Sequence, residues 1–277
     1  MPINSKEDFR ADCRKSPDTM HISNLSPLVV LFGPVASGRT MALIRLTRYL
    51  QEKGYHVAPE RSFRPPYYQA YQNVCDSFLR MCDNRYCGVS CNLEMLLVSV
   101  NDRHGRTVCQ LLDAPGEVFF NPYEPQGAWH TSLDYIRNLR NERIWLYFVE
   151  NNRDNHEMRM QYAQRIRQHV YDSSRIDKAV FVFSKVDKTD YLINEGEVEM
   201  PQLYNAIKDQ YTDIFVPFEN KPPLKWFKKY SCRFVPFSSG CYNPLIDTNG
   251  NWVVDYVSGH DVFPKMLWDA ILRSISK

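Results

Sequence analysis

The sequence predicts an α/β fold in which a mostly parallel sheet carries helices on both faces. Three observations lead to this prediction. Short apolar stretches alternate along the chain with segments of helical periodicity, the first apolar stretch runs into a glycine-rich loop, and an amphipathic helix closes the chain. The 277 residues suffice for one large α/β domain or two small ones.

The first half of the chain contains three predicted strands and one regular helix. The apolar run Leu28–Gly33 ends in glycine and has the composition of a buried parallel strand. Apolar residues then recur at helical spacing through residues 40–54. Residues 92–102 and 105–116 are predicted to form two strands that pair antiparallel through a polar turn.

The second half continues the alternation of strands and helices. Its predicted strands are residues 142–150, 178–188 and 232–240, and its predicted helices are residues 156–174, 202–215 and 262–275. Strands separated by helical segments are typical of crossover connections, so we expect most of these strands to run parallel.

Domain boundaries follow from the segments that break this pattern. Residues 1–26 are polar and unpatterned, which predicts a tail or a covering segment. Residues 27–277 are predicted to form one domain, with insertions near 55–90 and 191–229. Both insertions contain exposed-looking aromatic residues that could bind a partner.

The charge and the hydropathy of the chain exclude several classes of protein. The 34 basic and 32 acidic residues leave a formal charge of +2, which gives no reason to expect nucleic acid as a partner. No apolar run approaches the roughly 18 residues of a transmembrane helix, and the first residues lack the apolar core of a signal peptide. We therefore expect a cytoplasmic protein without a transmembrane segment.

The eight cysteines are expected to be reduced thiols, because the chain is long and carries no export signal. Four of them lie close together, at Cys75, Cys82, Cys87 and Cys91. Their spacing lacks the C-x2-C pairs of ordinary zinc sites, so small buried side chains are the preferred interpretation.

A glycine-rich loop, Gly33–Thr40, joins the first strand to the first helix. In such a loop successive backbone N–H groups point into one concavity, and the N-terminus of the helix adds positive potential. The loop fits the P-loop pattern G-x-x-x-x-G-K-[ST] except that Arg39 replaces the lysine. Thr40 is placed to bind Mg²⁺ through its hydroxyl group.

Three further short motifs follow apolar strands. "LLDAPGE" places Asp113, Gly116 and Glu117 after the strand of residues 105–116, and an aspartate there can hold Mg²⁺ through water. "SKVD" (184–187) lies at the end of the predicted strand 178–188, and "FSSG" (237–240) lies at the end of the predicted strand 232–240. Each motif alone is an ordinary turn, but ligands of open parallel sheets bind at the carboxyl ends of the strands.

Taken together, the four motifs resemble those of Ras-like GTPase domains of the translation-factor-related class. The insertions and the altered P-loop are also similar to the divergent bacterial modules called double-GTPases. The resemblance implies a P-loop G-domain fold that binds GTP or GDP with Mg²⁺. In "SKVD", it implies that the carboxylate reads guanine while the lysine stem packs along the base.

The resemblance assigns a role to each candidate site residue. The catalytic candidates are Glu117, Arg39 and Gly116. The metal candidates are Thr40, Asp113 and Ser90, the last in place of a missing switch threonine. The nucleotide-binding candidates are Gly33, Val35, Ala36, Ser37, Gly38, Arg39, Thr40, Met41, Ser184, Lys185, Asp187, Ser238, Ser239 and Gly240.

Three departures from the family pattern bear on activity. Arginine at position 39 is bulkier than lysine and planar, Glu117 stands where glutamine usually orients the attacking water, and Val35 replaces a glycine. The sequence predicts a guanine-nucleotide switch with slow GTP hydrolysis and a protein partner at its switch or insertion regions. The alternative is a pseudo-GTPase that serves as a scaffold. A P-loop kinase or ATPase would leave "SKVD" unexplained.

Overall fold

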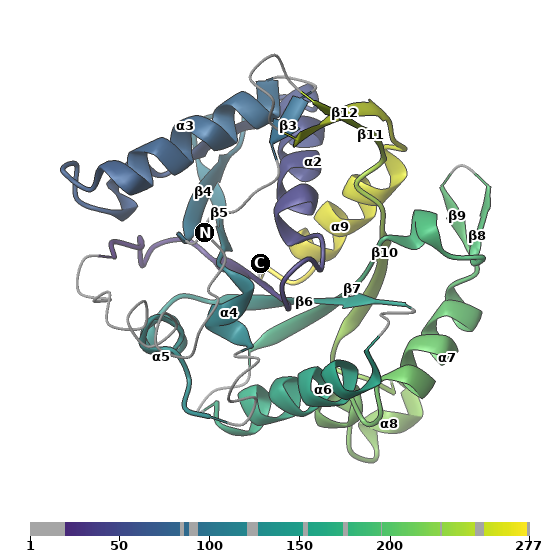
Figure 1. Ribbon diagram of the computed structural model, residues 1–277. Coiled ribbons are helices and arrows are strands. Elements are labelled where there is room, and N and C mark those ends of the chain that lie inside the picture. The colour runs from purple at the N-terminus through teal and green to yellow at the C-terminus, as the bar shows by residue number, and fades with distance from the viewer. Residues whose placement is uncertain are drawn as a thin grey trace.

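A computed structural model describes residues 20–83, 86–88, 94–120, 127–151, 155–173, 177–194, 196–227, 229–246 and 252–275. Its main feature is a seven-stranded sheet with the strand order β10-β7-β6-β1-β5-β4-β2 (Figure 1). These strands are β1 (Leu28–Phe32), β2 (His56–Pro59), β4 (Leu96–Asn101), β5 (Thr107–Asp113), β6 (Arg143–Glu150), β7 (Lys178–Ser184) and β10 (Arg233–Phe237).

Five strands of this sheet run parallel to one another. β1 pairs parallel with β5 and β6, β6 with β7, and β7 with β10. β4 pairs antiparallel with β5, as the polar turn at residues 101–105 predicted, and β2 pairs antiparallel with β4. The predicted fold class, a mostly parallel sheet with helices on both faces, is confirmed.

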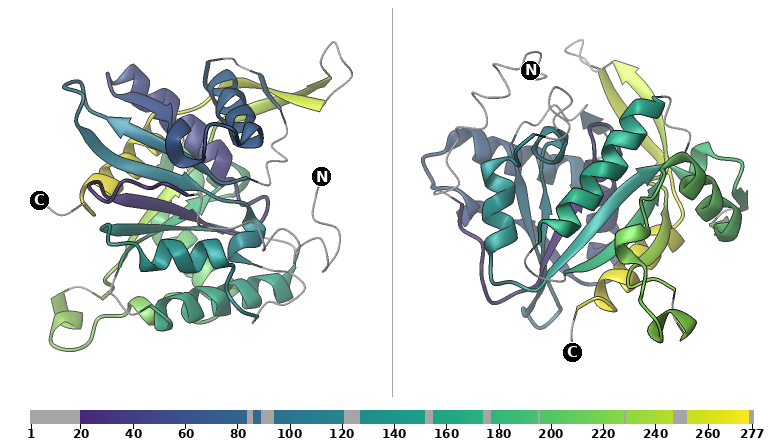
Figure 2. Two further views of the ribbon diagram at one scale, coloured as in Figure 1. Left: turned by 90° about the vertical axis from the view of Figure 1, so that its left-hand side faces the viewer. Right: turned by 90° about the horizontal axis from the view of Figure 1, so that it is seen from below.

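Helices cover both faces of the sheet. α2 (Arg39–Glu52), α3 (Gln69–Asp83) and α9 (Val262–Leu272) lie on one face, while α5 (Thr131–Asn138) and α6 (His156–Tyr171) lie on the other (Figures 1 and 2). The central strand β1 is buried along its whole length, since both of its faces are covered. The remaining helical segments are α4 (Gly116–Phe119), α7 (Met200–Gln210), α8 (Leu224–Phe227) and the short 3-10 turns η2 (Arg61–Phe63), η3 (Val186–Lys188) and η4 (Val216–Phe218).

Two strands form the edges of the main sheet, and each contains a proline. β2 is four residues long and ends at Pro59, and β10 contains Pro236. β2 was not expected from the sequence, because a four-residue run with a histidine and a proline lacks a clear strand pattern. The stretch near 55–90, which the sequence indicated as an insertion, thus begins by extending the main sheet.

A second sheet of three strands also escaped prediction. β12 (Trp252–Ser258) pairs antiparallel with β11 (Cys241–Ile246) and with β3 (Tyr86–Gly88). The segment of β11 contains an Asn-Pro pair, which obscures the alternation of a strand. The smallest sheet pairs β8 (Leu192–Asn194) with β9 (Glu197–Val198) inside the stretch 191–229.

The described part of the N-terminal segment lies against the main domain. The amide of His21 donates to the carbonyl of Phe63, and the hydroxyl of Tyr135 donates to the carbonyl of Met20. Asn141 donates to the carbonyls of Ser23 and Ser26. Residues 20–26 therefore lie along the domain surface next to α5.

Cysteine side chains contribute to the core and form no disulfide among the described residues. Cys75 and Cys82 are buried, as the sequence predicted for that cluster, and Cys109 and Cys232 are buried as well. The side chains of Cys87 and Cys91 lie outside the described part of the chain. Among the described helices, none is long and apolar enough to cross a membrane.

Candidate functional site

Four sequence motifs follow the carboxyl ends of β1, β5, β7 and β10. These strands run parallel, so the loops that leave them lie along one edge of the main sheet. β1 and β5 are direct neighbours, as are β7 and β10, and β6 lies between the two pairs. The fold therefore brings the four motifs to one side of the molecule, as their placement in the sequence predicted.

The loop between β1 and α2 is shaped by two residues with left-handed backbone. Ala36 has a φ of 61° and Gly38 has a φ of 88°, a conformation that glycine adopts without a steric penalty. The amide of Ser37 donates to the carbonyl of Pro34 at 3.3 Å, and α2 begins at Arg39 immediately after the loop. A left-handed turn that leads into a helix of 14 residues is a ready-made anion site.

The side chains of Arg39, Thr40 and Asp113, which the sequence predicts to bind phosphate and a metal ion, lie close together. The hydroxyl of Thr40 donates to the Oδ2 atom of Asp113 at 2.6 Å. The Nη1 atom of Arg39 lies 3.5 Å from the Oδ1 atom of Asp113 and also donates to the carbonyl of Ala114. Arg39 and Asp113 are both buried, so the guanidinium group serves as the counter-charge of this carboxylate.

Burial changes the acidity of both partners in this ion pair. Desolvation raises the pKa of Asp113, while the charge of Arg39 and the hydrogen bond from Thr40 oppose that rise. Desolvation lowers the pKa of Arg39, and the charge of Asp113 opposes this change. Each charge therefore stabilises the ionised form of the other in a place that would otherwise disfavour both.

The DAPGE segment lies directly against the glycine-rich loop. A Cβ atom placed on Gly116 would lie 2.4 Å from the backbone nitrogen of Val35 and 2.8 Å from its Cγ2 atom. Only glycine allows the two loops to approach this closely. Glu117 is half-buried in the short helix α4, and its charge acts on Arg39. Val35 therefore lies against Gly116, the residue that precedes Glu117.

The SKVD loop is held by an acidic residue that the sequence analysis did not single out. Lys185 has a left-handed backbone with a φ of 57°, and its Nζ atom donates to the Oε1 atom of Glu150 at 2.8 Å. Glu150 ends the neighbouring strand β6, and its carbonyl accepts a hydrogen bond from Tyr211. Ser184 is buried at the end of β7, whereas Asp187 is exposed.

The last motif lies after β10. Ser238 is buried, and its hydroxyl accepts a hydrogen bond from the amide of Gly240 at 3.1 Å. The carbonyl of Ser239 accepts from the hydroxyl of Tyr242. Met41 lies half-buried in the first turn of α2, while Ser90, the candidate for the missing metal ligand, lies outside the described residues.

Three polar atoms around the glycine-rich loop are buried without a hydrogen-bond partner. They are the Oγ atom of Ser37, the Nε atom of Arg39 and the Oδ1 atom of Asp113. Buried polar groups are rarely left unsatisfied, so these donors and acceptors fit a polar ligand with both phosphate oxygens and a bound cation. The Thr40 and Asp113 oxygens are of the type that Mg²⁺ prefers. Among the described residues, no group of three or more histidine, cysteine or acidic side chains forms a separate metal site.

Arg165 on α6 joins the DAPGE side of the site to the rest of the domain. Its exposed fraction is 2%, and it donates to the carbonyls of Phe119, Gly127 and Ala128 at 3.2, 2.8 and 3.4 Å. Its guanidinium carbon lies 3.3 Å from the ring centre of Trp129. Burial lowers the pKa of Arg165 to about 10. The sequence does not reveal this role of Arg165, because a charged residue at helical spacing gives no sign of the carbonyls that it will meet.

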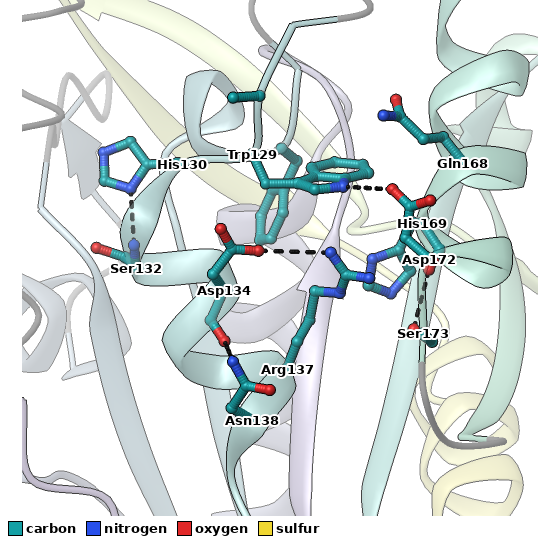
Figure 3. Close-up of polar contacts among 12 residues, drawn as sticks. Trp129, His130, Ser132, Asp134, Arg137, Asn138, Gln168, His169, Asp172 and Ser173 are labelled. Carbon is teal, nitrogen blue, oxygen red and sulfur yellow. Dashed lines mark hydrogen bonds and ion pairs between the residues drawn. The ribbon is translucent and has the colours of Figure 1, made fainter.

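His169 lies one turn further along α6 and is also buried, with an exposed fraction of 1% (Figure 3). Its ring packs against those of Trp145 at 4.3 Å and Phe32 at 5.2 Å, centre to centre. Nearby, the indole of Trp129 donates to Asp172, which links the segment before α5 to the end of α6. His169 is therefore a core residue, whereas His104 is exposed in a turn.

The burial of His169 predicts a pH-dependent stability. Desolvation and the charges of three nearby arginines hold the pKa of His169 well below its usual range. Below about pH 6.5 the imidazole is protonated in the unfolded chain but neutral in the folded one, so acidification favours unfolding. We expect a loss of about 1.4 kcal/mol of unfolding free energy per pH unit from this residue. In the His169→Phe variant, the phenyl ring suits the aromatic surroundings. Its unfolding free energy, measured by urea denaturation at several pH values, should change less steeply with pH below about pH 6.5, by that amount per pH unit.

A matched histidine provides the control for this measurement. His104 is exposed, so the His104→Phe variant should keep the full dependence of unfolding free energy on pH. If the unfolding free energy depends on pH equally in the wild type and in the His169→Phe variant, His169 is not the source of this pH dependence.

Comparison with known proteins finds likeness only among solved structures. No protein-family model matches the sequence, and a search of the curated proteins finds no match. The Ski7 GTPase-like domain of S. cerevisiae bound to GTP matches with a TM-score of 0.46 and 15% identity, over 99% of this chain and 53% of that one. Toc33 of Arabidopsis thaliana in complex with Mg²⁺ and GMPPNP has a TM-score of 0.46 and 14% identity, over 99% and 93%.

A third match is the G domain of the T. maritima FeoB iron transporter, with a TM-score of 0.39 and 13% identity, over 90% of this chain and 98% of that one. The chain spans about half the length of the two Ski7 structures that it matches. The Ski7 match is described as a GTPase-like domain and the FeoB match as a G domain. Their TM-scores are 0.46 or lower and their identities are 13–15%, so the fold and the site of this chain are described from its own residues alone.

Proposed function

We propose that the chain binds a guanine nucleotide with Mg²⁺ at the carboxyl edge of its main sheet. The observation that carries this proposal is the hydrogen bond of 2.6 Å between Thr40 and Asp113. Thr40 ends the glycine-rich loop, whose backbone is suited to bind an anion. The phosphates would lie on the backbone of residues 33–40, and Thr40 would bind the metal ion. Mg²⁺ would supply charge neutralisation for the phosphates.

The base-reading part of the site consists of the SKVD and FSSG loops. The carboxylate of Asp187 is exposed at this edge and would accept hydrogen bonds from the guanine N1 and N2 groups. The ion pair of Lys185 with Glu150 supports this role, since it would fix the lysine stem on which the base would pack. Ser239 and Gly240 would face the edge of the base.

We further propose that hydrolysis is slow. The Nη1 atom of Arg39 is directed at Asp113 and Ala114, so the charge of Arg39 is shared with the protein and only partly available to the phosphates. Val35 and Gly116 are in contact, so a γ-phosphate would require these loops to separate. The same two observations favour the second candidate, a pseudo-GTPase scaffold that keeps the fold and the nucleotide but not the turnover.

Two measurements test the proposal. Calorimetric titration of the purified chain with GDP and GTP should give micromolar or tighter binding, and mass analysis of the denatured protein should identify any co-purified nucleotide. Absence of binding to both nucleotides would refute the proposal. Release of phosphate that disappears in the Thr40→Ala variant would establish a GTPase and exclude the scaffold.

Guanine selectivity should depend on Asp187. Asp187→Asn removes the acceptor for the N1 and N2 groups, so we expect the affinity for GDP to fall about 100-fold, because a buried unpaired donor costs a few kcal/mol. Adenine nucleotides, which already bind weakly, should be unaffected. Asp190→Asn, an exposed aspartate three residues further on, is the matched control. Equal losses for guanine and adenine nucleotides would count against the assigned role.

A further inference from the structure

The segment 219–230, which we call the 219–230 loop, projects from the molecule, and hydrogen bonds join its two ends. Glu219 and Tyr230 form an antiparallel bridge, and the amide of Asn220 donates to the carbonyl of Lys229 at 2.9 Å. The hydroxyl of Tyr230 is hydrogen-bonded to that of Tyr204 at 2.6 Å. The base of the loop is therefore anchored in the domain, and α8 lies at its outer end (Figure 2).

The tip of the 219–230 loop exposes three large apolar side chains. The exposed fractions are 57% for Leu224, 80% for Trp226 and 88% for Phe227, and all three lie in α8. Single exposed apolar residues are normal, but neighbouring apolar side chains on an ordered projection indicate a binding surface. The helix α8 has only four residues, whereas a stable protein interface usually covers about 800 Å² on each partner.

Lysines surround this apolar tip. The sequence of the 219–230 loop contains four lysines and one acidic residue, a local charge of 4 − 1 = +3, while the whole chain has a formal charge of only +2. Lys221, Lys225 and Lys229 are exposed, and Lys225 pairs with Glu219 at 3.2 Å. Tryptophan favours the headgroup region of a bilayer, and clustered lysines are attracted to anionic lipids.

We propose that the 219–230 loop docks on the surface of an anionic lipid bilayer. Trp226 and Phe227 enter the headgroup region, and the surrounding lysines face the lipid phosphates. The loop precedes β10, so it lies at the amino ends of the parallel strands, whereas the candidate nucleotide loops leave their carboxyl ends. The bound molecule thus presents its nucleotide edge away from the membrane. The docking surface lies within the stretch 191–229 that the sequence indicated for a partner.

Co-sedimentation of the full chain with vesicles tests this proposal. We expect binding to phosphatidylcholine vesicles that contain about a third phosphatidylserine, little binding to phosphatidylcholine alone, and weakening by salt. Trp226→Ser/Phe227→Ser should reduce binding at least about tenfold, because the inserted apolar area is lost. Lys221→Gln/Lys229→Gln should reduce it about 30-fold, since each lysine near an anionic surface contributes about fivefold.

A control variant and a spectroscopic signal make the test specific. Tyr67→Ser, at an aromatic residue that is 82% exposed outside the loop, should bind vesicles as the wild type does. Brominated lipids should quench part of the tryptophan fluorescence of the wild type. This quenching should be absent in the Trp226→Phe variant, which lacks the tryptophan that enters the headgroup region. The proposal is overturned if the wild type ignores anionic vesicles, or if the Trp226→Ser/Phe227→Ser variant binds them equally well. Binding to polyglutamate but not to vesicles would overturn it in favour of an acidic protein partner.

Discussion

Replacement of Arg39 by methionine is expected to lower the free energy of unfolding by about 3 kcal/mol near neutral pH. The guanidinium group lies 3.5 Å from the Oδ1 atom of Asp113, and both side chains are buried. Removing one partner leaves the other charge buried without compensation, which is far more costly than removing both. Urea denaturation followed by circular dichroism measures this loss.

A double variant and an exposed ion pair complete this experiment. Arg39→Met/Asp113→Leu removes both charges and should recover most of the stability that Arg39→Met loses. Arg61→Met breaks an ion pair with Asp76 in which both side chains are about half exposed, so its effect should stay within about 0.5 kcal/mol. An Arg39→Met variant as stable as the wild type would show that Arg39 is not the counter-charge of Asp113.

The Arg165→Met variant is also expected to lose about 3 kcal/mol of unfolding free energy. Methionine fills much of the space but leaves the carbonyls of Phe119, Gly127 and Ala128 without their donor. It also removes the contact of the guanidinium group with Trp129. The same variant should make the segment that contains Glu117 more sensitive to limited proteolysis.

Arg167 on the same helix is the matched control for Arg165. It is partly exposed and makes an ion pair of 3.2 Å with Asp213, so Arg167→Met should change the unfolding free energy by no more than about 0.5 kcal/mol. If both arginine variants unfold at the same urea concentration as the wild type, the role assigned to Arg165 is wrong.

The parallel strands of the main sheet and the four motifs were predictable because their signals are local. β1, β5, β6, β7 and β10 are short apolar runs, and each motif residue follows one of them directly in the sequence. The carboxyl ends of parallel strands share one edge, so order along the chain was enough to predict that the motifs would meet.

Other parts of the site depend on contacts between distant segments and could not be predicted. Arg165 and His169 look like ordinary polar residues of a helix, and only the packing of α6 against the sheet shows that they are buried. In the sequence, Glu150 is an ordinary acidic residue at the end of a strand, and nothing in its surroundings reveals the ion pair with Lys185. The pairing of β3 with β12 joins residues more than 150 positions apart, which no local pattern encodes.

The prolines at the two edges of the main sheet have a consequence for self-association. A strand edge with a full row of N–H groups can template the addition of another chain, and proline offers no N–H group. Pro59 interrupts that row on the short β2, and Pro236 interrupts it on β10. Both ends of the hydrogen-bonded ladder are thus poor starting points for β-aggregation, which protects a sheet whose central strands are almost entirely apolar.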